Sequence, residues 1–186
     1  IVALAIALLA GPGWLGNAAA QAPAVQRTDA GIQAKPLAPG IYVTGRLAAD
    51  DLAKLKAEGV AAVVDLLPDA EAMSGATSAQ MKARAAAVGL FFAFIPTEPG
   101  VIPAANVDAL SRALAESGRP VVLYCRSGNR ATHVWALSEA SRPGGADAPA
   151  IARAAAASGF SVADIAQDIA RRAAASVPAD VPVVVT

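Results

Sequence analysis

Short apolar runs alternate with helix-like segments along most of this chain, and this alternation constrains the fold more than any other feature. The runs at 60–66, 90–95 and 121–124 have strand length and are almost entirely apolar, which is typical of parallel strands covered on both faces. A shorter strand is expected at 41–45. Helical spacing or a closing glycine marks the segments 48–58, 78–88, 104–117, 129–140, 149–158 and 161–175. The pattern predicts an α/β fold, a central mostly parallel sheet flanked by helices.

The two ends of the chain lack this pattern. Residues 1–20 begin with an apolar run and end in small residues at Ala20, so we expect a signal peptide whose basic n-region is missing and export, to a bacterial periplasm. The alternative is an uncleaved membrane anchor, but the run is shorter than the about 20 residues of a spanning helix. The expected divisions that follow are a linker at 21–39, the catalytic domain at 40–175 and a tail at 176–186.

The composition narrows the possible partners. Lysine and arginine number 15, as do aspartate and glutamate, so no basic face suggests nucleic acid. Membrane contact is expected only through an uncleaved signal segment. The sequence has neither a Cys/His cluster with metal spacing nor a Walker motif, so no metal or other cofactor is expected. The lone cysteine, Cys125, cannot form an internal disulfide, and an unpaired thiol in an exported protein is exposed to oxidation. Its presence therefore suggests a function.

Cys125 opens a six-residue loop between the strand at 121–124 and the helix at 129–140. Backbone N–H groups in such a loop point inward, and the dipole of the following helix favours negative charge there. This setting makes a thiol reactive, so Cys125 is the predicted nucleophile, and Arg130 is predicted to support the anion cradle. The remaining residues of the predicted anion-binding loop are Arg126, Ser127, Gly128 and Asn129.

Cleavage of a phosphate ester would also need a proton donor for the leaving oxygen. Glu98 lies in the loop at 96–103, where such a group would be placed, and Asp65 lies near the end of the strand at 60–66. Both are hypotheses, because a glutamate in a loop is more commonly only solvated. The single histidine, His133, is expected on the surface of the helix after the loop.

Four stretches of the sequence resemble a bacterial single-domain sulfur transferase family, which also occurs at the front of beta-lactamase hydrolase-like proteins. They are residues 42–47, 51–55, 63–69 and 125–130. The order of elements resembles the dual-specificity phosphatase fold, with a rhodanese-like fold as the runner-up. The Cys-x4-Arg loop is one residue shorter than the Cys-x5-Arg loop of protein tyrosine phosphatases and resembles the rhodanese loop.

The resemblance implies a rhodanese-type sulfurtransferase that needs no cofactor. Cys125 would take sulfane sulfur from thiosulfate or a persulfide, hold it as a cysteine persulfide, and pass it to a thiol or cyanide. The shorter loop makes a narrower cradle, which favours this chemistry over a phosphate held on sulfur. The first alternative is a cysteine-dependent phosphatase of the dual-specificity type, with Glu98 or Asp65 as the acid. The second is a non-catalytic thiol redox or anion sensor.

Overall fold

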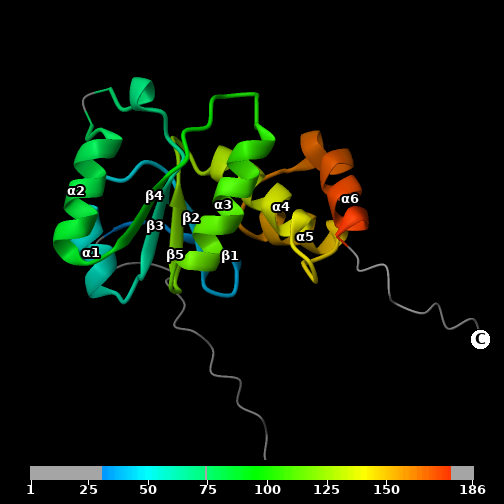
Figure 1. Cartoon of the computed structure of the whole chain (residues 1–186), viewed down its shortest axis with the longest axis horizontal. Coiled ribbons are helices and arrows are strands. Elements are labelled where there is room, and N and C mark those ends of the chain that lie inside the picture. The colour runs from blue at the N-terminus through cyan, green and yellow to red at the C-terminus, as the bar shows by residue number, and fades with distance from the viewer. Residues whose placement is uncertain (1–30, 74, 177–186) are drawn as a thin grey trace, which may run out of the picture.

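A five-stranded sheet with helices on both faces forms the body of the protein (Figure 1). The computed structural model describes residues 31–73 and 75–176, so the expected signal peptide and nearly all of the expected tail lie outside the described residues. The strand order is β1-β2-β5-β3-β4, and within this sheet β1 is antiparallel to β2 while the other neighbours are parallel. The strands are β1 (Lys35–Ala38), β2 (Ile41–Thr44), β3 (Ala62–Asp65), β4 (Phe91–Phe94) and β5 (Val121–Tyr124). The predicted α/β fold is confirmed.

The helices follow the predicted order, with small changes at their ends. The helix expected at 161–175 starts with a 3₁₀ turn, and a second 3₁₀ turn lies between β3 and α2. The helices and turns are α1 (Asp51–Ala57), η1 (Asp69–Glu71), α2 (Ser78–Val88), α3 (Ala104–Glu116), α4 (Asn129–Ser141), α5 (Ala148–Ala157), η2 (Ala163–Ile165) and α6 (Ala166–Ala175).

The sheet separates two apolar cores. Because successive side chains of a strand point to opposite faces, Val63 and Val122 pack toward α1 and α2, whereas Val64 and Leu123 pack toward α3 and α4. Figure 1 shows the two sets of helices on the two sides of the sheet. Burying a side chain of this size stabilises the fold by about 1.5–3 kcal/mol. The central strands are therefore held from both sides, as their apolar sequences predict.

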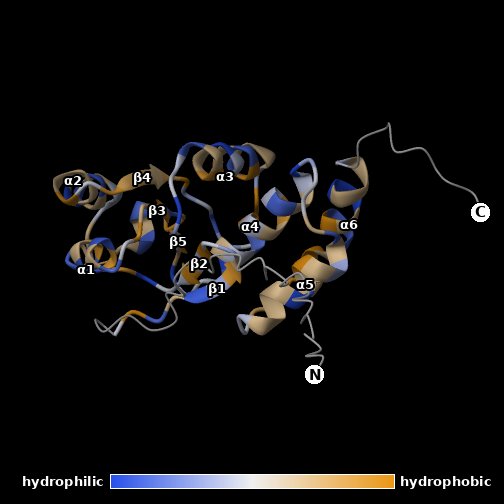
Figure 2. Ribbon diagram, turned by 90° about the horizontal axis from the view of Figure 1, so that it is seen from below, coloured by the Kyte–Doolittle hydropathy of each residue, from blue (hydrophilic) through white to orange (hydrophobic). Residues whose placement is uncertain are grey.

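Helix α4 is buried along most of its length, because it packs against α3, α5 and α6 (Figure 2). Its buried positions include the large Trp135 and the polar Thr132 and His133. Such a helix has little freedom to move relative to the sheet. The loop that joins β5 to α4 is thus fixed at both of its ends.

The sequence-based boundary of the linker is wrong at its C-terminal end. Strand β1 falls within residues 21–39 and pairs with β2 along the edge of the sheet. The Ser158 hydroxyl donates a hydrogen bond to the carbonyl of Pro36, which ties this strand to the end of α5. An edge strand tolerates proline because its missing N–H faces away from the ladder.

Within the part of the chain that the structure describes, no helix is both long and apolar enough to span a membrane.

Candidate active site

The Cys125 loop lies at the carboxyl ends of the three neighbouring parallel strands β2, β5 and β3. β5 lies between β2 and β3, and Cys125 follows β5 directly. Ligand sites of open α/β sheets form beyond such carboxyl ends. Cys125 is 1% exposed, and its Sγ accepts a hydrogen bond from the backbone N of Gly128 at 3.2 Å. This donor can stabilise the negative charge of a thiolate sulfur.

Gly128 gives the loop its tight shape. Its φ is +92°, and a Cβ at this position would lie 2.8 Å from the ring of Phe160, so both the backbone and the space favour glycine. Its carbonyl accepts hydrogen bonds from the backbone N and the hydroxyl of Thr132, at 3.0 and 2.9 Å. These contacts fix the turn between Cys125 and the start of α4.

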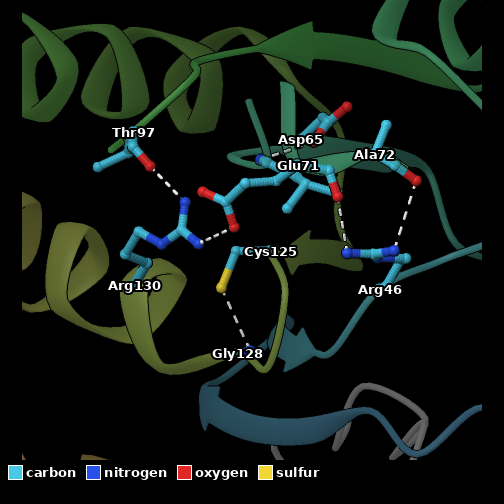
Figure 3. Close-up of polar contacts among 9 residues, drawn as sticks. Arg46, Asp65, Glu71, Ala72, Thr97, Cys125, Gly128 and Arg130 are labelled. Carbon is cyan, nitrogen blue, oxygen red and sulfur yellow. Dashed lines mark hydrogen bonds and ion pairs between the residues drawn. The ribbon is translucent and has the colours of Figure 1, made fainter. Parts of the chain in front are cut away.

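Arg130 stands at the start of α4 and is only 13% exposed in its side chain. One terminal nitrogen, Nη1, donates to the carbonyl oxygen of Thr97 at 2.5 Å, and the other, Nη2, donates to Oε2 of Glu71 at 2.7 Å. In Figure 3 the guanidinium and the Glu71 carboxylate meet above Cys125. Both terminal nitrogens of this guanidinium are thus engaged by neighbouring oxygen atoms, one of which belongs to a carboxylate.

Glu71 is the site residue that the sequence analysis missed. It ends η1, the turn that follows β3, and Arg46 holds this turn through the backbone. Arg46 donates from Nη2 to the carbonyl of Glu71 at 2.8 Å and from Nη1 to that of Ala72 at 3.4 Å (Figure 3). The signal that could have indicated Glu71 is its place just beyond the carboxyl end of a central strand, at the edge where the Cys125 loop lies.

Asp65 lies at the end of β3 and is 3% exposed. Its Oδ1 accepts a hydrogen bond from the backbone N of Leu67 at 2.8 Å, and its carboxyl also bonds to the side chain of Tyr124. Burial raises the pKa of Asp65 to about 6. Asp65 and Tyr124 are register partners, and Tyr124 packs toward α1 and α2 whereas Cys125 belongs to the other core. Asp65 and Cys125 thus face opposite sides of the sheet.

Glu98 is exposed in the loop at 96–103. It directly follows Thr97, the residue whose carbonyl accepts the hydrogen bond from Arg130. The structure therefore places the backbone of this loop next to the Cys125 loop, with the Glu98 side chain open to solvent. Of the two acid hypotheses, Glu98 is the one on a segment that contacts Arg130.

The other loop residues lie at the surface. Arg126, Ser127 and Asn129 are exposed, in contrast to the buried Gly128. The carbonyl of Asn129 lies 2.8 Å from Nδ1 of His133. Exposed side chains in this loop are available to a ligand, while the backbone carries the shape of the cradle.

His133 is not on the surface, as the sequence suggested, but 6% exposed. Its Nε2 lies 2.9 Å from Oδ1 of Asp164, a residue of η2. The hydrogen bond with His133 is the main cause that lowers the pKa of Asp164, against a smaller opposing effect of burial. This contact docks the last helical segment on α4, and residues near 164 cover what would otherwise be an exposed helix face.

The described residues contain no group of three or more His, Cys, Asp or Glu side chains that could hold a metal ion.

The fold is that of a phosphatase-like protein. More specifically, the chain belongs to the family described as beta-lactamase hydrolase-like protein, phosphatase-like domain, whose model matches residues 33–142. A beta-lactamase hydrolase-like protein from Agrobacterium fabrum is 30% identical over 100 residues, which cover 54% of this chain and 23% of that protein. The chain thus matches about a quarter of the length of this relative.

Solved structures support the same fold. A candidate phosphatase from Neisseria meningitidis Z2491 is 23% identical, with a TM-score of 0.63 over 74% of this chain and 96% of that one. A DUF442 candidate phosphatase from Shewanella putrefaciens CN-32 is 18% identical, with a TM-score of 0.60 over 80% and 92%. At this identity the two structures establish the fold alone.

The prediction of a rhodanese-type sulfurtransferase is wrong. The family and the fold are phosphatase-like, which agrees with the alternative and not with sulfur transfer. The predicted partners, a sulfur donor and a thiol or cyanide acceptor, are therefore wrong as well. The sulfurtransferase prediction rested on the family resemblance and on the loop length, since a six-residue loop was expected to form a cradle too narrow for phosphate. Nη2 of Arg130 donates to Oε2 of Glu71, so the guanidinium at the end of the short loop does hydrogen-bond to an anionic oxygen.

Proposed function

We propose that the protein is a cysteine-dependent phosphatase that cleaves phosphate monoesters. The observation that carries this proposal is the Arg130 guanidinium, which donates to a carboxylate oxygen at the mouth of the Cys125 loop. Carboxylate and phosphoryl groups both accept paired hydrogen bonds from an arginine fork. Membership of the phosphatase-like domain family supports the same chemistry.

In the proposed reaction the Cys125 thiolate attacks phosphorus, and the bond from phosphorus to the ester oxygen breaks. Backbone N–H groups at 126–130 and Arg130 stabilise the charge on the equatorial oxygens. Glu98 gives its proton to the leaving oxygen. Water then attacks the phosphocysteine and gives a proton back to the Glu98 carboxylate, and the sulfur–phosphorus bond breaks to release inorganic phosphate and the thiolate.

The positions of the side chains support the roles proposed in this scheme. The Gly128 N–H that already donates to Sγ holds the sulfur in the loop. Glu98 is assigned as the acid over Asp65 because its loop contacts Arg130, whereas Asp65 is buried on the other face of the sheet.

Turnover of 4-nitrophenyl phosphate by the wild type and by Cys125→Ser tests the proposal. We expect release of nitrophenolate by the wild type alone, and an acid-quenched wild-type protein that carries one phosphoryl group on Cys125 by mass spectrometry. Equal melting temperatures would show that the serine variant is folded. Absence of both turnover and adduct across aryl phosphates and phosphopeptides, with a free thiol demonstrated, would refute the proposed activity.

A further inference from the structure

We propose that Glu71 is an internal ligand of the anion-binding site, which a substrate must displace from Arg130 before it can bind fully. This inference rests on the proposed function, since it takes Arg130 as the residue that binds phosphoryl oxygens. Both terminal nitrogens of Arg130 are engaged, Nη1 with the Thr97 carbonyl and Nη2 with Oε2 of Glu71. An oxyanion that accepts from Nη2 would compete with the carboxylate oxygen already there.

The pairing between Glu71 and Arg130 is partly shielded from water. The Glu71 side chain is 21% exposed and that of Arg130 is 13% exposed, and the N···O distance is 2.7 Å. A charged hydrogen bond in such a setting is stronger than the same contact on an open surface. The carboxylate is therefore a real competitor for the guanidinium and not a loosely associated surface charge.

The other oxygen of the Glu71 carboxylate shows why displacement is feasible. Oε1 is buried and has no hydrogen-bond partner within the described chain. A buried carboxylate oxygen without a donor loses its hydration without compensation, so this conformation is only half satisfied. Rotation of the side chain toward solvent would relieve that cost while a phosphoryl group takes its place on Arg130.

The backbone that carries Glu71 is anchored more firmly than its carboxylate. Arg46 donates to the carbonyls of Glu71 and Ala72 on one side of the turn. On the other side the carboxylate of Asp69 accepts hydrogen bonds from the backbone N and the hydroxyl of Ser78, at 2.6 and 2.8 Å. The turn is thus held at both ends, and the exchange involves the Glu71 side chain while η1 stays in place.

This arrangement selects among anions. A phosphate monoester dianion brings two negative charges and three acceptor oxygens to the site, against the single charge of Glu71. A ligand with a single carboxylate offers Arg130 no more negative charge than the Glu71 carboxylate already does. We therefore expect the site to favour dianionic oxyanions, and we expect removal of the Glu71 charge to strengthen their binding.

Calorimetric binding of tungstate to the full chain, carried out in a Cys125→Ser background, provides the test. Glu71→Gln removes the competing charge and is expected to tighten tungstate binding about tenfold, since ion-paired hydrogen bonds of this kind are worth roughly that factor. The charge-matched control is Glu116→Gln, because Glu116 is exposed at the end of α3, near where β5 begins and away from the Cys125 loop. This control is expected to leave the binding constant unchanged.

The alternative is that Glu71 only positions Arg130. In that case Glu71→Gln would weaken tungstate binding, and this result would overturn the inference. An unchanged binding constant, or no tungstate binding to any variant, would overturn it as well. Glu71→Asp retracts the carboxylate by one methylene and should tighten binding by a smaller factor, which decides the question if the glutamine variant does not fold. The experiment measures binding and not turnover. If Glu71→Gln tightens tungstate binding but the protein with Cys125 intact shows no phosphatase activity, this inference stands and the phosphatase proposal fails.

Discussion

Tyr124 lies directly beside Asp65, at the last paired position of two neighbouring parallel strands. Both side chains are buried, and they are joined by a hydrogen bond. Burial is the largest effect that raises the pKa of Asp65 from its ordinary 3.8 to about 6, and burial also raises the pKa of Tyr124. The residue just before Cys125 is therefore bonded to a carboxyl group whose proton the folded protein holds more tightly than the unfolded chain does.

Asp65→Asn is predicted to stabilise the protein at neutral pH. Between about pH 4 and pH 6 the folded state keeps the Asp65 proton that the unfolded state loses, so the free energy of unfolding falls as the pH rises through this window. A shift of about two pKa units corresponds to at most about 3 kcal/mol. Asparagine can still accept from the backbone N of Leu67.

Urea unfolding of both proteins between about pH 4 and pH 8 measures the effect. The variant should be more stable than the wild type above about pH 6, and the difference should vanish near pH 4. If the free energies of unfolding of the two proteins changed in parallel with pH, ionisation of the buried Asp65 would not be the cause of the loss of stability.

Arg130→Lys is predicted to lower phosphatase kcat/KM by about 10²–10³, the usual loss when a donor to developing negative charge is removed. Lysine keeps the charge but has no planar fork, so it cannot bond to the Thr97 carbonyl and to an oxyanion in the geometry of Arg130. Arg112→Lys, on the exposed side of α3, is the matched control and should retain full activity. Steady-state kinetics on an aryl phosphate measure kcat/KM for both variants. Full activity of Arg130→Lys would exclude a role for the planar guanidinium.

Glu98→Gln is predicted to slow turnover in a way that depends on the leaving group. Loss of a general acid costs about 10²–10⁴ in rate when the leaving oxygen needs a proton, and far less for a stable anion such as nitrophenolate. A series of aryl phosphates with leaving groups of increasing basicity should therefore give a steeper dependence of log kcat in the variant. Asp65→Asn should leave that dependence as in the wild type. The reverse pattern would transfer the acid role to Asp65.

The central strands could be predicted because their signal is local. Parallel strands covered on both faces are continuous apolar runs, and the runs at 60–66, 90–95 and 121–124 each contain a strand of the sheet. Strand β1 has no such signal, because it begins with the exposed Lys35 and Pro36. Its pairing depends on β2, which supplies the partner backbone, so residues 35–38 resembled a linker.

The site was predictable only where it is contiguous in sequence. The loop that contains Cys125 and Arg130 follows one strand and opens one helix, so its residues reveal it. Glu71 lies 59 positions before Arg130, and its place depends on the backbone contacts made by Arg46. His133 was expected at the surface because Asp164, which pairs with it, comes 31 positions later. The family resemblance and the loop length together favoured sulfur transfer, and neither of them reports what the arginine contacts.

The last prediction concerns the shape of the Cys125 loop. Gly128→Ala should destabilise the protein, because an L-residue at φ +92° costs about 1–2 kcal/mol. The new Cβ would also lie 2.8 Å from the Phe160 ring and 3.3 Å from the carbonyl of Thr44, and overpacking of this kind typically costs about 1–3 kcal/mol more. Relief of these contacts would move the N–H that donates to Sγ of Cys125.

Gly59→Ala separates the backbone cost from the contact cost. Gly59 has a similar φ of +84°, but nothing lies within 4 Å of the position that an alanine Cβ would occupy, and it follows α1 rather than the Cys125 loop. Urea unfolding should show a smaller loss for Gly59→Ala than for Gly128→Ala, and only Gly128→Ala should also lower kcat/KM. Equal losses of stability together with unchanged activity in both variants would mean that the loop accommodates a side chain at 128, and that its N–H contact with the sulfur does not support the thiolate.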